Sequence, residues 1–151
     1  MCDTNTESTF NFNTTEAKIT KEVCQQFVAV RTGKLVKTSS LCKETKVMLA
    51  RVASMDKSQG YLVRGKIDVT ELTEESGLYT FQGLSEVIFQ DNKINWGRVI
   101  SFFYYAAVIL EKLKQNGKEH LNDKVALWLA ICVSKKLSKW IKEQGNGWVR
   151  I

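Results

Sequence analysis

The most apolar stretch of this 151-residue chain, residues 95–110, reads NWGRVISFFYYAAVIL. After its first four residues the stretch is hydrophobic on almost every side, with four consecutive aromatic residues at 102–105. A helix from about Ile94 to Leu113 with this composition must lie inside a domain, because only neighbours on every side can cover it. The stretch therefore predicts a helical domain built around one buried helix.

A second long helix is expected from about Leu121 to Lys142, after Asn116-Gly117 has ended the first. Its apolar residues recur at helical spacing, which places them on one face of the helix. They are Leu121, Val125, Trp128, Leu129, Cys132, Val133, Leu137, Trp140 and Ile141. This helix is therefore also expected inside the domain.

Two more helices are expected nearer the N-terminus. The first runs from Glu16 to about Arg31 and has on one face Ile19, Val23, Phe27 and Val30. The second begins at a Ser39 or Ser40 cap, ends near Gly60 and carries Leu41, Thr45, Met48, Leu49, Val52 and Met55.

The stretch between these helices and the central one is less regular. Residues 61–80 contain glycines and short apolar patches, which predict short helices and loops. A further helix from about Tyr79 to Phe89 places Phe81, Leu84 and Ile88 inward.

One folded domain accounts for most of the chain. Residues 1–15 are polar and rich in Thr and Asn, so we expect a disordered arm there and a single domain over 16–151. The absence of proline from the sequence favours uninterrupted helices. No apolar run reaches the roughly 20 residues that a membrane span needs.

The net charge of +6 would suit a nucleic-acid or membrane partner, but the basic residues are scattered among 16 acidic ones. The densest set, Lys135, Lys136, Lys139 and Lys142, is interpreted as a solvated helix face. A basic helical domain that binds nucleic acid therefore stays only as an alternative, and we expect no nucleic-acid partner.

The sequence offers little for catalysis. The single histidine, His120, lies in a polar turn without a neighbouring nucleophile, and no phosphate-binding loop or clustered metal ligands occur. The cysteines at 24, 42 and 132 fall in apolar helical patterns, as small hydrophobic residues of a reducing compartment do. We expect no enzyme, no catalytic residue, no metal and no cofactor.

The residues at the start of the central helix suggest different structural roles. Asn95 can cap the helix, and Gly97 lets another backbone come close. Arg98 puts a cation at the N-terminal end of the helix, where the helix dipole disfavours positive charge, which suggests that it binds a carboxylate. A solvent-facing arginine beside a core tryptophan remains the alternative interpretation of these residues.

Two motifs carry a resemblance to a known family. Residues 95–103 resemble the first Bcl-2 homology motif of the Bcl-2 family of apoptosis regulators. Residues 140–148, WIKEQGNGW, resemble the second motif with one extra residue between the glycines. One long helix separates the two motifs, as in the family. The resemblance extends over about residues 16–151 and is weakest at 56–78.

The resemblance implies an all-α, Bcl-2-like helical bundle with a buried central hairpin and a hydrophobic surface groove for an amphipathic helix. In such a groove Arg98 would pair with the aspartate of the ligand helix, and Asn95 would hydrogen-bond beside it. Gly97 would let the ligand approach closely. Ser101 and Tyr105 would line the floor.

Other helices would supply the walls of this groove. On the helix before the central one, Leu84 and Ile88 would receive ligand side chains, although both could equally be ordinary core residues. On the second expected helix, Met48, Val52 and Met55 would line the groove. Trp96 and Trp148 are expected to support the fold.

The family's third motif is only partly matched. The best match is Leu49 with Ala53 and Ser54, which lacks the aspartate at the key position, and Val52 with Asp56 fits poorly. A protein that donates this helix to partners would be expected to keep the aspartate. The absence of this aspartate favours a protein that binds such helices over one that presents its own helix to partners.

The expected function is therefore inhibition of apoptosis by sequestering the death-motif helices of pro-apoptotic family members. A pro-apoptotic member that permeabilises membranes is the alternative. Homodimerisation and peripheral membrane contact stay open, as does a viral origin. We expect a cytoplasmic location, with association with the outer mitochondrial membrane open, and a C-terminal anchor that is absent or trimmed.

Overall fold

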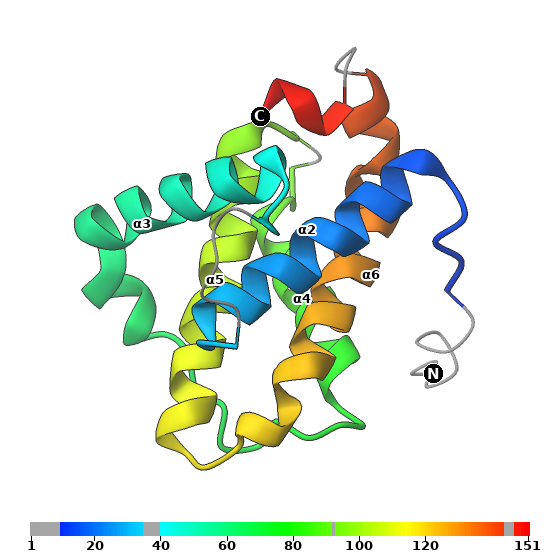
Figure 1. Cartoon of the computed structure of the whole chain (residues 1–151). Coiled ribbons are helices and arrows are strands. Elements are labelled where there is room, and N and C mark those ends of the chain that lie inside the picture. The colour runs from blue at the N-terminus through cyan, green and yellow to red at the C-terminus, as the bar shows by residue number, and fades with distance from the viewer. Residues whose placement is uncertain (1–9, 35–39, 92, 144–146) are drawn as a thin grey trace.

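The computed structural model describes residues 10–34, 40–91, 93–143 and 147–151. Figure 1 shows that the regular structure in these ranges is helical. The α-helices are α2 (Thr15–Arg31), α3 (Lys43–Arg64), α4 (Gly77–Ile88), α5 (Trp96–Gln115) and α6 (Asn122–Glu143). Two short 3₁₀ helices, η2 (Glu119–Leu121) and η3 (Gly147–Arg150), flank α6.

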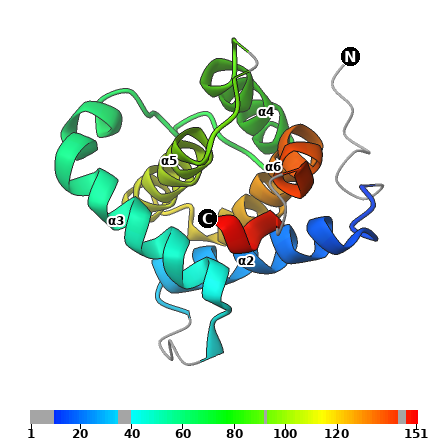
Figure 2. The ribbon, with the colours of Figure 1, turned by 90° about the horizontal axis from the view of Figure 1, so that it is seen from above.

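Helix α5 is the centre of the bundle, as its composition predicts. It packs against α2, α3, α4 and α6, which surround it when the bundle is seen from above (Figure 2). The side chains of Phe102, Phe103 and Tyr104 have no exposed surface. Helix α6 returns antiparallel to α5 through η2 and carries Trp128 into the same core. The expected all-α bundle with a buried central hairpin is confirmed.

The C-terminal segment is fastened to the first described helix. The indole Nε1 of Trp148 donates a hydrogen bond to Oγ1 of Thr20 at 2.8 Å, and both residues are fully buried. The Trp148 ring also lies 5.4 Å from that of Trp96, which packs edge-on to Trp140 at 5.2 Å. The tryptophans of the two motifs therefore meet in one cluster that supports the fold.

Helix α3 differs from the helix expected in this region. It begins at Lys43, after Ser40 and Cys42, whereas Ser39 lies outside the described residues. It also continues past Gly60 to Arg64, whose side chain forms ion pairs with Asp56 and Glu111. Cys42 consequently lies just before the helix and is only partly buried.

The segment that follows α3 contains turns and no helix until α4 begins at Gly77, two residues earlier than expected. At the other end, the rings of Phe10 and Phe12 meet edge-to-face, with their centroids 4.6 Å apart, and pack against the core. Of the expected disordered arm, residues 1–15, residues 1–9 lie outside the described residues, and residues 10–15 have a defined place in the structure.

Two cysteines are buried thiols. Cys24 and Cys132 lie in the core, and burial raises the pKa of both, that of Cys132 to about 12. Both thiols therefore stay protonated at neutral pH and act as small hydrophobic side chains. In the described ranges, no helix combines the length and the apolar composition of a membrane span.

We predict that Gly77→Ala destabilises the protein by about 1–3 kcal/mol, the usual range for overpacking a core. A methyl group at this position would lie 2.0–2.3 Å from the ring of the fully buried Trp128. Thermal or urea unfolding measures the change. Gly83→Ala, on the same helix with nothing within 4 Å, is the matched control. It should gain up to about 1 kcal/mol from helix propensity. Equal effects of the two substitutions would contradict this packing.

Candidate functional site

One face of α5 forms a strip that the surrounding helices cover incompletely. Arg98, Ser101, Tyr105 and Ile109 follow each other at spacings of three, four and four, so they lie on the same face. The first three are only partly buried, unlike the aromatic residues between them. The strip extends about 16 Å along the helix, given a rise of about 1.5 Å per residue.

Two helices stand on either side of this strip. Helix α3 packs on α2 and α5, whereas α4 packs on α5 and α6. Over the described residues, α3 and α4 barely touch each other. Met55 of α3 reaches the strip, since Oγ of Ser101 lies 3.8 Å from its sulfur. The α5 strip is therefore the floor between two walls.

A cavity of about 290 Å³ lies at the Ile109 end of the strip. It opens between α4, α5 and the turns that follow α3, and most of its lining is apolar. Its residues are Lys66, Ile67, Asp68, Val69, Leu72, Thr80, Gly83, Leu84, Val87 and Ile109. Leu84, a predicted ligand contact, thus lies in the wall of a hollow that can take apolar side chains.

The helices beside this strip expose large hydrophobic residues. Val87 of α4, which lines the cavity, is 65% exposed, and Leu62 in the last turns of α3 is 52% exposed. Tyr79 lies two turns before Val87 on the same face of α4 and is 64% exposed. Of these three residues, Val87 lies at the cavity itself, and exposed apolar surface at a hollow is a feature of interaction sites.

At the other end of the strip, Arg98 is bound within the chain. Its guanidinium makes two bonds to the Asp91 carboxylate, Nη1 to Oδ1 and Nη2 to Oδ2, the latter at 2.9 Å. Nη1 also donates to the carbonyl oxygen of Lys93 at 3.0 Å and lies 3.5 Å from that of Ile88. Arg98 therefore serves a carboxylate, as the sequence suggests, but one that the protein itself supplies.

The ion pair is partly exposed, and it strongly lowers the pKa of the Asp91 carboxyl group. The hydrogen bonds from Arg98, together with one from the backbone N–H of Lys93 at 3.1 Å, lower the pKa of Asp91 to about 2. About a third of the Arg98 side chain stays in contact with solvent. A ligand carboxylate can therefore reach the guanidinium, but it must share or displace Asp91.

Asn95 and Gly97 have local roles at the start of α5. The Asn95 side chain caps the helix by accepting a hydrogen bond from the backbone N–H of Arg98 at 2.9 Å. Gly97 is exposed, and a methyl group there would lie 3.1 Å from the same Asn95 oxygen. The cap fixes the first turn, and the bare glycine leaves room above it.

The predicted contacts on α3 lie at different depths. Met55 is half-buried beside Ser101, but Met48 and Val52 have no exposed surface. Their side chains face the core because 45, 48, 52 and 55 share the side of α3 that packs on the bundle. A ligand could touch Met48 or Val52 only if α3 moved. Ile88, at the end of α4, is half-buried next to Arg98.

A polar network ties the second half of α3 to α5. Arg64 pairs with Asp56 at 2.9 Å and with Glu111 at 2.6 Å, and the Tyr104 hydroxyl donates to Asp56 at 2.9 Å. Burial and the Asp56 carboxylate raise the pKa of Tyr104 to about 12. Gly60 leaves space for this network, since a methyl group there would lie 2.5 Å from Arg64.

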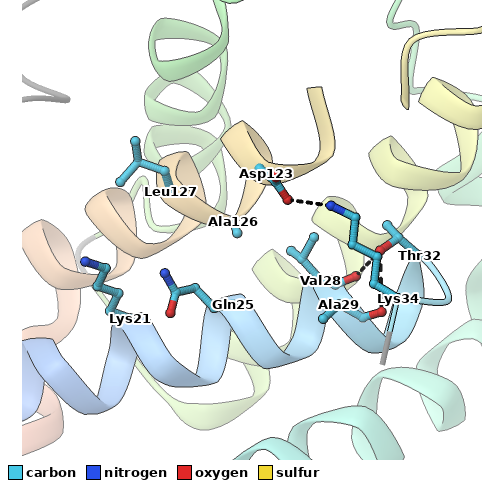
Figure 3. A pocket seen from close by; sticks show the side chains of 9 residues that line it. All are labelled: Lys21, Gln25, Val28, Ala29, Thr32, Lys34, Asp123, Ala126 and Leu127. Atoms are coloured by element: carbon cyan, nitrogen blue, oxygen red, sulfur yellow. Dashed lines mark hydrogen bonds and ion pairs between the residues drawn. The ribbon is translucent and has the colours of Figure 1, made fainter. Parts of the chain in front are cut away.

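A second hollow of about 290 Å³ lies between α2 and α6, away from the α5 strip (Figure 3). Its rim carries the ion pair of Lys34 with Asp123 at 3.0 Å. Its walls are formed by side chains such as Lys21, Gln25 and Leu127. This hollow offers an alternative place for a ligand. Within the described ranges, no group of three or more potential metal ligands comes together.

Sequence reasoning missed several parts of the groove. Asp91 lies in a turn seven residues before Arg98, and no periodic pattern indicates that a turn residue folds back onto a helix. Val87 and Ile109 follow the predicted groove residues Leu84 and Tyr105 by three and four residues, so helical spacing could have found them. The wall residues 66–72 lie in an irregular stretch without such a signal.

We predict that Asp91→Asn lowers the stability of the protein at neutral pH, because it removes the anionic partner of Arg98. The folded pKa of Asp91 is about 2, below its ordinary value of 3.8, so its stabilisation is present above about pH 4. It is lost as the pH falls from about 4 to about 2. Urea unfolding of wild type and variant across this range should show curves that converge at low pH. A stability difference that does not change with pH would contradict the ion pair.

Comparison with known proteins identifies the family. The model of the family described as "Apoptosis regulator proteins, Bcl-2 family" matches residues 48–148. The chain is 32% identical over 68 residues to dog apoptosis regulator Bcl-2 and 27% over 77 residues to human Bcl-2-like protein 1. It is 28% identical over 80 residues to mouse apoptosis regulator BAX. These matches cover 45%, 51% and 53% of the chain and 28%, 32% and 41% of the relatives' own lengths.

Solved structures share the fold. The zebrafish pro-survival protein NRZ superposes with a TM-score of 0.79 at 18% identity, covering 93% of each chain. Trichoplax adhaerens Bcl-2L2, solved with the BH3 segment of Bak, gives 0.74 at 19% over 89% of this chain and 95% of that one. Chicken BOK gives 0.70 at 19%, with coverages of 90% and 95%. With a family match over two thirds of its length and this fold over about nine tenths of it, the chain belongs to the Bcl-2 family of apoptosis regulators.

Proposed function

We propose that this protein is a pro-survival receptor for pro-apoptotic family members. It would bind their death-motif helix, the third Bcl-2 homology motif or BH3 helix, in the groove between α3 and α4. Sequestration of that helix would keep its owner from permeabilising the outer mitochondrial membrane. The protein would act by binding alone, as a regulator rather than an enzyme. It would work in the cytoplasm or at the mitochondrial surface.

The observation that carries this proposal is the arrangement along α5. The apolar cavity at Ile109 and the cation at Arg98 lie on one helix face, about 16 Å apart. An amphipathic ligand helix of about three turns spans that distance, with apolar anchors at one end and a carboxylate at the other. Two structural relatives, NRZ and Bcl-2L2, are found in complexes with the BH3 segments of Bad and Bak.

Most of the binding energy would come from apolar anchors entering the cavity and the space beside Leu84. Arg98 would add selectivity. A ligand without a carboxylate at this point would leave the Arg98–Asp91 ion pair intact and would gain no binding energy from Arg98. A ligand with the carboxylate gains only the difference between its own bond and that of Asp91. We therefore expect the aspartate of the ligand to matter, but less than an ion pair with a free arginine would.

A second candidate is a pro-apoptotic member that permeabilises membranes. The similarity to BAX and the fold shared with BOK favour it. The two candidates differ in behaviour: the permeabilising protein releases dye from liposomes of mitochondrial lipid composition when activated, and the receptor suppresses such release. Homodimer formation and peripheral contact with the membrane would accompany the second function more than the first.

Calorimetric titration with a panel of BH3 peptides tests the proposal. We expect at least one peptide to bind with a dissociation constant of about 1 µM or less, and Arg98→Glu to weaken it about tenfold or more. Arg31→Glu, the same charge change at an exposed residue of α2, is the matched control and should leave affinity within about threefold.

Asp91→Asn sharpens the test, since it releases Arg98. It should raise the affinity of a peptide that carries the aspartate and leave that of its alanine variant unchanged. Binding that is indifferent to Arg98, Asp91 and the peptide aspartate would rule out the proposed site. Absence of binding by every peptide, with dye release from liposomes, would favour the permeabilising function instead.

A further inference from the structure

One wall of the groove is hydrogen-bonded to a side chain that does not line the cavity. After α3 ends at Arg64, the chain forms turns up to Gly77 and supplies Ile67, Val69 and Leu72 to the lining of the apolar cavity. This segment has no helical hydrogen-bond ladder: the Val69 carbonyl oxygen accepts a bond from the backbone N–H of Leu72 at 3.0 Å, and further donors come from one side chain. That side chain connects the wall to another part of the bundle.

Lys118 supplies these donors. Its ammonium group lies 3.1 Å from the carbonyl oxygen of Val69, 2.8 Å from that of Thr70 and 3.0 Å from that of Leu72. An ammonium group has three N–H donors, and here each has a backbone acceptor in the same wall. The side chain is only partly exposed, and hydrogen bonds to a charged donor are stronger than those between neutral groups.

Lys118 is itself held at a fixed place by the end of α5. The backbone N–H of Lys118 donates to the carbonyl oxygen of Leu113 at 2.8 Å, and that of Gly117 to Lys114 at 3.3 Å. Gly117 has a φ of 70°, the left-handed conformation that such a helix end requires and that glycine adopts freely. The ammonium therefore connects the wall to the C-terminal end of the groove floor.

We propose that Lys118 is a positioning residue of the groove, which holds residues 66–72 at the distance from α4 at which the cavity exists. This inference rests on the proposed function, because it concerns the affinity for the same ligand helix. Lys118 binds the carbonyl groups of Val69 and Leu72, and the buried side chains of the same two residues line the cavity. A shift of these carbonyl groups would therefore also move the cavity lining. Loss of the ammonium lets the wall shift, and the apolar anchor of the ligand loses its fitted hollow.

The test compares wild type, Lys118→Met and Lys118→Arg by calorimetric titration with the tightest BH3 peptide. Methionine keeps most of the aliphatic stem but removes the donors, and we expect the dissociation constant to rise about tenfold or more. Arginine keeps the charge and the donors and should restore affinity to within about threefold of wild type. Lys114→Met, which removes an exposed charge from the last turn of α5, should leave affinity unchanged.

A double-mutant cycle separates positioning from a general loss of stability. Each apolar anchor of the peptide is changed to alanine in turn and titrated against wild type and Lys118→Met at a temperature where both are folded. The anchor that enters the cavity should lose less affinity against Lys118→Met than against wild type, because its hollow is already impaired. Hydrogen exchange should also become faster in residues 66–74 of the variant.

The outcomes distinguish this inference from the function on which it rests. If wild type binds no BH3 peptide, the proposed function fails. If wild type binds a peptide and Lys118→Met binds it equally well, the function stands and the positioning role of Lys118 is wrong. The same holds if each anchor-to-alanine change lowers the affinity for Lys118→Met by the same factor as for wild type.

Discussion

The structure depends on the burial of α5. Because this helix is apolar on almost every side, it is stable only when other helices surround it, and α2, α3, α4 and α6 do so. The cover is complete over Phe102, Phe103 and Tyr104 but incomplete along the face that contains Ser101 and Tyr105. In the proposed function, the ligand helix would lie on that remaining strip and cover it.

Both ends of the strip are arranged by contacts within the chain. At one end Arg98 is held by Asp91 and by backbone carbonyl groups, so the cation has a fixed position before any ligand arrives. At the other end the cavity wall is fastened to the end of α5 through Lys118. On the far side, the network of Arg64, Asp56 and Glu111 ties α3 to the same helix. The two walls of the groove are thus held in place before any ligand arrives, which would lower the entropic cost of binding a helix there, whereas the Arg98–Asp91 pair would compete with the ligand carboxylate.

The sequence predicts the helices well because their apolar residues recur over many turns. The all-round apolar composition of α5 and the stripe of α6 indicate burial without reference to any relative. It predicts the groove less completely. Helical spacing shows that Met48 and Val52 face inward but not whether they meet core or ligand, and the structure buries both completely. The roles of Asp91 and Lys118 depend on how irregular turns fold back in space, and local pattern carries no signal for that.

The central claim is that the ligand helix lies on α5 between α3 and α4. Backbone chemical-shift mapping by NMR, with labelled protein and an unlabelled BH3 peptide of Bad or Bak, tests it most directly. The account predicts that the largest changes fall in residues 66–72, 80–91 and 98–109. Changes confined to 21–34 and 123–127, around the hollow between α2 and α6, would contradict it, since they would place the ligand on the other pair of helices.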